Sequence, residues 1–261
     1  MPLSDPPRAT PSDPSPDGTA PAAAPPGQQV PGPHGPAGHV LDAPAWSALS
    51  GAHRHLAIGN ELVLRYPEDV SPFVGVRDWD HPEVWEALMD VFGHDATVSV
   101  SHAEPELPAG WRTEFSLPGV QLVQTDALAP RPDEEAVELG AANSAEMQAL
   151  VARTKPGPFL PRTHEMGRYV GIRRDGALIA MAGERLHPDG WTEISAVAVD
   201  EAHRRQGLAS RLVLDVAFHI QQRGDRALLH AAAANTSAIA GYEKLGFALR
   251  RRLTFGAVRT P

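Results

Sequence analysis

The stretch from Glu193 to Ser210 constrains the fold most, because it joins a buried strand to a helix through a short basic loop. Its first half reads EISAVAV, an apolar, Val-rich pattern that is typical of a buried strand. From Ser210 to Arg223, apolar residues recur at helical spacing. Between the two elements lie Arg204, Arg205 and Gly207. The first amides of a helix have no internal partner and its dipole favours an anion, so this loop is predicted to bind phosphate.

The same loop resembles the pyrophosphate loop of a known family. Residues Arg204–Ala209 read RRQGLA, which fits the Q/R-x-x-G-x-G/A signature of the GNAT superfamily of N-acetyltransferases. Upstream, Glu193-Ile194 and Val197–Val199 are similar to that family's fourth strand. Downstream, Asn235 and the run YEKLGF over Tyr242–Phe247 resemble a block near the end of many members. Three blocks in this order and spacing make the resemblance specific, whereas the loop alone recurs by chance.

The resemblance covers roughly residues 135–252 and implies an α+β fold, with a central mixed, mostly antiparallel sheet flanked by helices. We therefore expect residues 134–255 to form an acetyltransferase domain. The elements predicted there are a helix over 134–153, with a break near Gly140 left open, a strand hairpin over 169–185, a strand over 193–199 and a helix over 210–223. They are followed by a short strand over 227–230, a helix that is capped by Thr236 or Ser237 and ends before Gly246, and a last strand over 247–253.

The remaining residues divide by composition. Residues 1–44 hold 13 of the 26 prolines and few aliphatic or aromatic side chains, so they cannot bury enough apolar surface to offset their ordering entropy. We expect a disordered tail, and leave open whether it is a Pro-rich ligand or the result of a start site placed too early. Residues 45–126 are expected to form a smaller α/β unit with a helix over 81–93 and strands within 62–66, 97–101 and 111–125, where a turn at Leu117-Pro118-Gly119 divides one or two strands.

The net charge of −9 is unevenly distributed along the chain. Residues 45–135 carry five Lys and Arg against sixteen Asp and Glu, whereas residues 200–261 carry ten against five. Bound coenzyme A explains a basic end that contains a phosphate loop, and a solvated basic face is the alternative. The acidic half disfavours nucleic acid as a partner.

Several classes of chemistry are disfavoured by composition. The chain has no cysteine, which excludes disulfides, thiolate metal sites and a cysteine nucleophile, and its histidines lack metal-ligand spacing, so no metal is expected. No apolar run approaches the roughly 20 residues of a membrane span, and the first residues lack a signal pattern. We therefore expect a cytoplasmic protein without membrane contact.

The resemblance implies acetyl-CoA as the cofactor. It assigns the phosphates to the loop and the start of the following helix, and the pantetheine arm to the backbone of the preceding strand and to an asparagine that alternatively caps a helix. The residues expected to bind acetyl-CoA are Val197, Ala198, Val199, Arg204, Arg205, Gln206, Gly207, Leu208, Ala209, Ser210 and Asn235.

Acetyl transfer to an amine needs a base for the amine and an acid for the leaving thiolate. The resemblance implies that Glu193 is the general base, and the alternative is a surface carboxylate near a turn. Tyr242 follows Ile239 by three residues, so its ring shares the inward face of a helix. The resemblance makes this tyrosine the general acid, and the alternative is a tyrosine that only packs in the core.

The acceptor pocket is expected in the Pro-rich loop before the hairpin. Phe159, Arg162 and Thr163 lie in this loop, and Glu184 on the hairpin is a further candidate for the acceptor site or the base. An ordinary solvated loop and a structural glutamate are the alternatives.

These features predict an N-acetyltransferase that moves an acetyl group from acetyl-CoA directly to a primary amine of a small molecule or peptide. A non-catalytic acyl-CoA-binding sensor and an acyltransferase for longer acyl donors are the alternatives. Glu193 and Tyr242 distinguish the enzyme from the sensor, which needs neither. The expected partner is the amine substrate, without nucleic acid or membrane, and a homodimer is an open alternative to a monomer.

Overall fold

The computed structural model describes residues 38–101 and 106–261. In this part of the chain one eight-stranded sheet has the order β4-β11-β5-β10-β9-β8-β7-β6, and a three-stranded sheet has the order β1-β2-β3. The strands are β1 Ile58–Gly59, β2 Val63–Arg65, β3 Val74–Val76, β4 Thr97–Ser101, β5 Arg112–Gln124, β6 Val137–Leu139, β7 Tyr169–Arg174, β8 Ala177–Glu184, β9 Trp191–Val199, β10 Arg226–Ala232 and β11 Phe247–Arg259. The helices are α1 Pro44–Ser50, α2 Val84–Phe92, α3 Ser144–Thr154, α4 Leu208–Gln222 and α5 Thr236–Leu245, with short 3-10 turns η1 Val40–Asp42, η2 Arg54–Leu56, η3 Ala141–Asn143, η4 Thr163–Met166 and η5 Glu201–His203.

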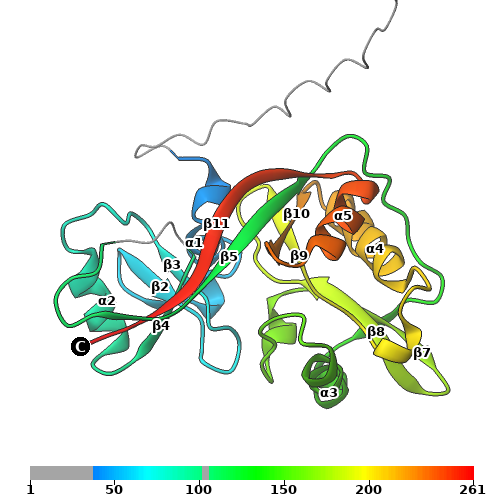
Figure 1. Ribbon diagram of the computed structural model, residues 1–261, viewed down its shortest axis with the longest axis horizontal. Coiled ribbons are helices and arrows are strands. Elements are labelled where there is room, and N and C mark those ends of the chain that lie inside the picture. The colour runs from blue at the N-terminus through cyan, green and yellow to red at the C-terminus, as the bar shows by residue number, and fades with distance from the viewer. Residues whose placement is uncertain (1–37, 102–105) are drawn as a thin grey trace, which may run out of the picture.

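The large sheet confirms the predicted fold class. Strands β9 and β10 are parallel, and the other neighbours in the sheet are antiparallel. Figure 1 shows the small sheet with α1 and α2 at one end of the molecule and α3, α4 and α5 at the other end, with β5 and β11 running between them. None of the described helices is both long enough and apolar enough to cross a bilayer.

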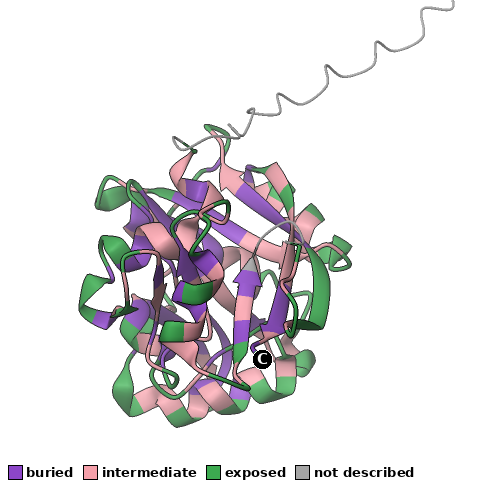
Figure 2. Ribbon diagram, turned by 90° about the vertical axis from the view of Figure 1, so that its left-hand side faces the viewer, coloured by how far each residue is buried: buried purple, intermediate pink, exposed green. Residues whose placement is uncertain are grey.

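Helix α4 covers one face of the large sheet with the apolar positions that the sequence predicts. Its buried residues include Leu212, Val216 and Ile220, which pack in one cluster with Ile194 of β9 and Leu229 of β10. Each such side chain contributes about 1.5–3 kcal/mol when it is buried. Figure 2 shows that buried residues follow the central strands and exposed ones the peripheral loops. The opposite face of β9 and β10 is covered by η1, through Leu41 against Trp191 and Leu228.

Strand β5 corrects the expectation of a turn within residues 111–125. It is one strand of 13 residues because β11 pairs with it continuously across the expected turn, including Pro118 with Thr254 and Gly119 with Leu253. Proline lacks the N–H that a ladder uses, and it is tolerated here because the pairing of β5 with β10 stops at Gly119. Strands β4 and β5 thus join the large sheet, and the boundary expected between residues 126 and 134 does not separate two sheets.

The helix expected over 134–153 is shorter than the sequence suggested. Val137–Leu139 forms β6, which pairs with β7, and α3 begins only at Ser144. Gly140 has extended backbone angles (φ −140°, ψ −157°) and separates the strand from η3. Pairing with an exposed sheet edge therefore outweighs the helical spacing of the apolar residues in this segment.

The expected tail ends earlier than residue 44. Leu41 is fully buried and Asp42 pairs with Arg250 and Arg251, because both residues lie against the large sheet. The contacts of Leu41 and Asp42 thus help to attach residues 38–44 to the protein. Residues 1–37 lie outside the described residues.

Candidate active site

The predicted phosphate loop has left-handed backbone at two positions. Arg205 has φ 64° and Gly207 has φ 76°, and Gly207 directly precedes α4. A Cβ added to Gly207 meets no atom within 4 Å, so the space beside this glycine is open. Arg204 and Arg205 are exposed. The loop therefore presents two cations and the unpaired first amides of α4 to an open space, which is the arrangement that binds phosphate.

A cavity of about 630 Å³ extends from this loop to the centre of the large sheet. Strands β9 and β10 and the starts of α4 and α5 form most of its wall. Of the residues predicted to bind acetyl-CoA, Gln206 does not line the cavity. The predicted residues that do are Val197, Ala198, Val199, Arg204, Arg205, Gly207, Leu208, Ala209, Ser210, Asn235 and Tyr242.

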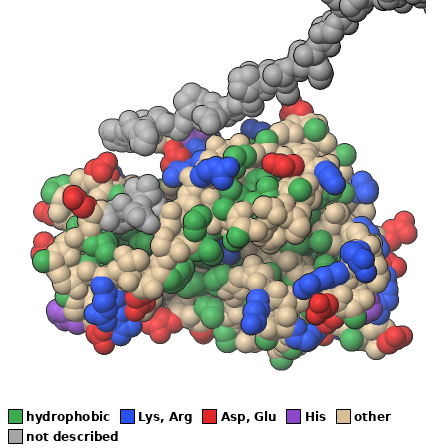
Figure 3. Space-filling model, in the orientation of Figure 1, with side chains coloured by type: hydrophobic (Ala, Val, Ile, Leu, Met, Phe, Trp, Pro, Cys, Tyr) green, Lys and Arg blue, Asp and Glu red, His purple; other side chains and the backbone are tan. Residues whose placement is uncertain are grey.

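Further basic residues line the same cavity. Lys155 at the end of α3 and His203 in η5 both contribute to its wall near the loop. Figure 3 shows Lys and Arg side chains over the half of the molecule that contains α3 and α4, with a few acidic ones among them. The positive charge expected from the sequence at this end of the chain is thus available to an anionic ligand.

The cavity reaches the sheet where two parallel strands part. Pairing between β9 and β10 ends at Ile194 with Leu229, whereas β9 continues to Val199 and β10 to Ala232. Ala196 has φ 51°, a left-handed conformation that is uncommon for alanine. On its other edge β9 still pairs with β8. The edge of β9 that faces the cavity therefore offers backbone groups that no strand of the described chain pairs.

Glu193 lies at the start of this opening and is fully buried. Its Oε1 accepts hydrogen bonds from Arg185 Nη2 (2.5 Å) and His230 Nδ1 (2.7 Å), and its Oε2 accepts one from Arg185 Nε (3.0 Å). The guanidinium of Arg185 in turn lies 4.5 Å from the ring centre of Phe73. The surface carboxylate considered from the sequence is therefore wrong, because the residue is inside the protein and paired on both oxygens.

Glu193 remains charged in this environment. Burial by itself raises the pKa of the carboxyl group, but the charge of Arg185 and the bond from His230 outweigh it and hold the pKa well below its usual range. A fully buried carboxylate cannot touch an amine in the cavity directly. His230 and Arg185, in contrast, both line the cavity, so they connect Glu193 to it.

The hydrogen bonds around His230 define its tautomer. Gln121 Nε2 donates to Leu41 O (2.9 Å), and Gln121 Oε1 accepts from Arg250 Nη1 (2.7 Å), so the orientation of this amide is determined. The same Nε2 lies 3.0 Å from His230 Nε2, which must therefore be an unprotonated acceptor. The proton of the neutral imidazole is then on Nδ1, which donates to Glu193. This is the carboxylate–imidazole arrangement that makes Nε2 basic.

Tyr242 lies on α5 at the wall of the cavity. Its ring is 6.3 Å from that of Phe247, edge to face, and it packs against the main core cluster. Burial raises the pKa of its hydroxyl group to about 12, so the hydroxyl is protonated at neutral pH. Asn235 caps the same helix by accepting from the amide of Ala238 (3.3 Å), which is the alternative role considered for it from the sequence, and the expectation that Thr236 or Ser237 is the cap is wrong.

The residues expected to form the acceptor pocket do not line the cavity. Phe159 is buried against Tyr169, with ring centres 5.5 Å apart. Thr163 is buried too, and its hydroxyl donates to Val70 O (2.7 Å). Arg162 pairs with Glu165 (2.7 Å) and, from the other side, with Asp69. These contacts attach the Pro-rich loop to the N-terminal elements.

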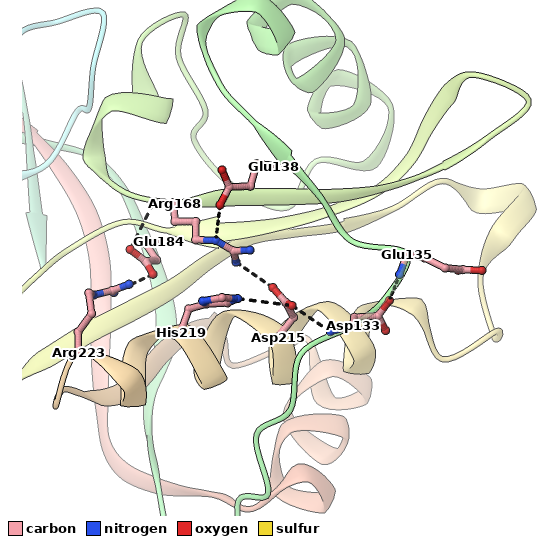
Figure 4. A network of polar contacts seen from close by, with 8 residues as sticks. All are labelled: Asp133, Glu135, Glu138, Arg168, Glu184, Asp215, His219 and Arg223. Carbon is pink, nitrogen blue, oxygen red and sulfur yellow. Dashed lines mark hydrogen bonds and ion pairs between the residues drawn. The ribbon is translucent and has the colours of Figure 1, made fainter.

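Glu184 is likewise removed from the cavity. It is almost completely buried; its Oε1 accepts from Arg223 Nη2 (2.8 Å) and its Oε2 from the amide of Arg168 (3.2 Å). Figure 4 shows it between Arg168 and Arg223, in a network that Arg168 continues to Asp215 of α4. Its contacts correspond to the structural alternative considered from the sequence.

Sequence reasoning did not identify Arg185, His230 and Gln121. A signal for His230 was present, since it is the polar residue in an otherwise apolar strand, ALLHAAA. Gln121 lies directly opposite His230 in the β5–β10 pair, which sequence spacing alone does not reveal. In the described residues no group of three or more His, Cys, Asp or Glu side chains is placed to hold a metal ion.

Comparison with known proteins agrees with this geometry. Residues 169–255 match the family model described as FR47-like protein. The mycothiol acetyltransferase of Thermobispora bispora is 29% identical over 191 residues, which are 66% of this chain and 62% of that protein. The corresponding enzyme of Saccharomonospora viridis is 29% identical over 75% of this chain and 68% of that protein. The chain thus spans less than two thirds of the length of the Thermobispora relative.

A solved structure gives a fuller match. A GNAT-family protein from Novosphingobium aromaticivorans is 32% identical, with a TM-score of 0.78, over 85% of this chain and 99% of that one. The match extends over the N-terminal elements as well as the region of the loop and the parted strands, since it leaves out only 15% of this chain. Identity at this level over nearly the whole of a relative shows that this chain belongs to the GNAT family of acetyltransferases.

Proposed function

We propose that the protein transfers an acetyl group from acetyl-CoA to a primary amine of a small molecule or peptide, by direct attack in a ternary complex. One observation carries this proposal: a single cavity connects a phosphate-type loop before α4 with a histidine-linked, buried carboxylate. The family and the names of the relatives support an acetyltransferase. A sensor that only binds acyl-CoA has no use for Glu193, His230 and Tyr242 around the same opening.

The loop and β9 divide the binding of acetyl-CoA between them. The pyrophosphate is assigned to the first amides of α4 and to Arg204 and Arg205, because charge-assisted bonds to helix N-termini are the strong ones. The pantetheine arm is assigned to the free edge of β9 over Val197–Val199. This places the thioester toward the point where β9 and β10 part, next to His230.

Proton transfer from the amine is assigned to the Glu193–His230 pair. As the amine nitrogen forms its bond to the carbonyl carbon, His230 Nε2 accepts the ammonium proton. This step requires that the hydrogen bond from Gln121 Nε2 to His230 Nε2 breaks, while the bonds of Gln121 to Leu41 O and Arg250 can persist. The imidazolium is stabilised by Glu193, which stays ionised. Glu193 therefore acts as the base through His230, which refines the role of general base that the family resemblance implies.

Proton transfer to the leaving group is assigned to Tyr242. When the carbon–sulfur bond breaks, the electron pair stays on sulfur, and a neutral hydroxyl group is needed nearby to protonate the thiolate. Tyr242 lines the cavity and is protonated at neutral pH, because burial raises its pKa. The products are the acetylated amine and the free thiol of coenzyme A.

Cofactor binding is tested with a matched pair of glycine variants. Gly207→Val should abolish the thermal stabilisation by acetyl-CoA, which is about 2.7 kcal/mol at a hundredfold excess over Kd, because the side chain fills the space beside the loop. Gly176→Val is the control, since Gly176 also has positive φ (81°) and open space, but lies in the β7–β8 turn. Equal loss of ligand stabilisation in both variants, or no stabilisation of the wild type, refutes the assignment.

Catalysis is tested by following thiol release from acetyl-CoA with a library of primary amines. A mycothiol-related amine is included because the named relatives are mycothiol acetyltransferases. Acetyl-CoA binding without turnover on any amine would favour the sensor. Faster turnover with longer acyl-CoA donors would instead favour the acyltransferase alternative.

A further inference from the structure

One wall of the large cavity carries a lysine that the proposed function does not use. Lys155 directly follows α3 and lines the cavity together with Thr154 and Pro156. It is exposed, and within the described residues its side chain has no ion-pair partner. A lysine ammonium is a point charge on a flexible stem of four carbons. It is therefore free to pair with an anionic group of a ligand in the cavity.

The end of α3 is attached to the phosphate loop by an ion pair. Arg153 Nε donates to Asp200 Oδ2 (3.1 Å), and Asp200 caps η5 by accepting from the amide of Ala202 (3.2 Å). Turn η5 leads directly into Arg204 of the loop. Figure 1 shows α3 and α4 on opposite sides of β8. Lys155 is thus held near the phosphate loop, but by a different element from the helix that the loop begins.

The backbone of Lys155 indicates that its side chain has a role. The residue has φ 50° and ψ 52°, a left-handed conformation. The residue that ends a helix in this conformation is usually glycine, because a side chain at positive φ costs stability. Such outliers cluster at functional sites. A lysine at a position that glycine would occupy with less strain is explained if its ammonium group binds a ligand.

The charges along the cavity leave one cation without an assigned partner. The lining contains Lys155, Arg185, Arg204 and Arg205, and none of the described residues that line it is Asp or Glu. Arg185 is already paired with Glu193. Coenzyme A carries negative charge at two separate places, the pyrophosphate and the 3′-phosphate on its ribose. The helix amides and the two loop arginines serve the pyrophosphate, so Lys155 is the cation that remains for the 3′-phosphate.

We propose that Lys155 binds the 3′-phosphate of coenzyme A and thereby makes the enzyme select acetyl-CoA over analogues that lack this phosphate. The inference rests on the proposed acetyltransferase function. A phosphate monoester carries up to two negative charges and accepts hydrogen bonds on three oxygens, so an ammonium group can pair with it without the fixed geometry of a guanidinium. Lys155 is in this assignment a specificity-determining residue and takes no part in proton transfer.

The test compares the binding of coenzyme A and 3′-dephospho-coenzyme A to the full chain by calorimetry. The wild type should bind coenzyme A about tenfold more tightly at low ionic strength, somewhat more than one exposed pair of single charges provides. The preference should shrink toward unity at about 1 M salt, because mobile ions screen exposed charges. Equal Kd values for the two ligands at low ionic strength overturn the proposal.

Lys155→Met provides the matched variant, since it removes the charge and keeps a long side chain. The two Kd values should then agree within about twofold, with that of dephospho-coenzyme A unchanged, whereas Lys155→Arg should retain the preference. Lys244→Met is the control, because Lys244 is the other lysine of the chain and lies exposed on α5 without lining the cavity. An unchanged preference in Lys155→Met, or an equal loss of affinity for both ligands, contradicts the assignment.

Lys155→Gly separates ligand binding from folding. This variant should lose the preference as Lys155→Met does, while its Tm stays the same or rises, because glycine adopts positive φ without strain. A Tm that falls together with the preference would assign the lysine to the fold and overturn its role toward phosphate. If the wild type binds neither ligand, the proposed function itself fails, and this result differs from binding of both with equal Kd.

Discussion

Glu193→Gln should lower both stability and turnover, and the structure predicts the size of the first effect. The carboxylate accepts three hydrogen bonds, two from Arg185 and one from His230. The amide of glutamine has only one acceptor oxygen. If this oxygen accepts from Arg185 Nη2 and His230 Nδ1, the amide NH₂ faces Arg185 Nε, which is also a donor. A buried guanidinium is then left without a counter-charge, which costs about 3–5 kcal/mol.

Calorimetry and thiol release measure the two effects separately. At about 2–4 °C per kcal/mol for a chain of this size, Tm should fall by roughly 6–20 °C. Turnover at a temperature where the variant is folded should fall on the order of 10²–10⁴-fold, with the Kd of acetyl-CoA unchanged, because Glu193 acts on the proton and not on phosphate. Partial recovery at high pH is expected, where more of the amine is already deprotonated.

A second substitution separates stability from catalysis. Glu193→Gln combined with Arg185→Met removes the unpaired cation, and the amide oxygen can still accept from His230 Nδ1. Replacing a buried ion pair by groups of similar volume is often neutral, so Tm should return most of the way to the wild-type value while turnover stays low. Wild-type turnover and Tm in Glu193→Gln would falsify both the burial argument and the role of the residue. Recovery of turnover together with Tm in the double variant would show that Glu193 is only structural.

Three further predictions follow from other parts of the protein. Tyr242→Phe should lower turnover on the order of 10²–10⁴-fold at every pH, without the high-pH recovery of Glu193→Gln, and full activity in a pH–rate profile would remove its role as acid. Deletion of residues 2–37 should leave Tm unchanged. Deletion of residues 2–44 should lower the free energy of unfolding by about 2–5 kcal/mol, because it also removes the buried Leu41, and urea unfolding measures this loss. Burial and the neighbouring His187 lower the pKa of His53 from 6.5 to about 4. Between these two pH values His53 is protonated in the unfolded chain but neutral in the folded protein. Stability should therefore decline as pH falls from 6.5 to 4, by roughly 3 kcal/mol for this residue, and His53→Gln should remove that part of the slope while His94→Gln at an exposed position should not.

The local elements of the second half of the chain could be predicted because their signals are local. The Val-rich strand, the two turns with glycine and the amphipathic α4 each depend on neighbours within a few residues. The cavity-lining positions of the loop, of Val197–Val199 and of Tyr242 followed from the same blocks. The resemblance predicted these cavity-lining positions because each of its three motifs specifies both a backbone conformation and a place in the sheet.

The partners of Glu193 and the acceptor side could not be predicted, because they depend on pairing between distant segments. His230 and Glu193 lie on neighbouring parallel strands although they are 37 residues apart in the chain, and Gln121 is 109 residues from His230. The Pro-rich loop looked like an acceptor loop because its side chains are polar and aromatic. In the structure Thr163 and Arg162 use this polarity to bind Val70 and Asp69 of the N-terminal elements.

The position of β11 has a consequence for how the protein is made. This strand leaves the ribosome after every other described strand, yet it lies between β4 and β5, which are synthesised more than a hundred residues earlier. Until it arrives, β4 has no ladder partner in the large sheet and one edge of β5 stays open, which exposes two strand edges to other chains. We expect nascent chains that lack residues 247–261 to depend on chaperones, and folding to be slow because the pairing that completes the sheet is non-local.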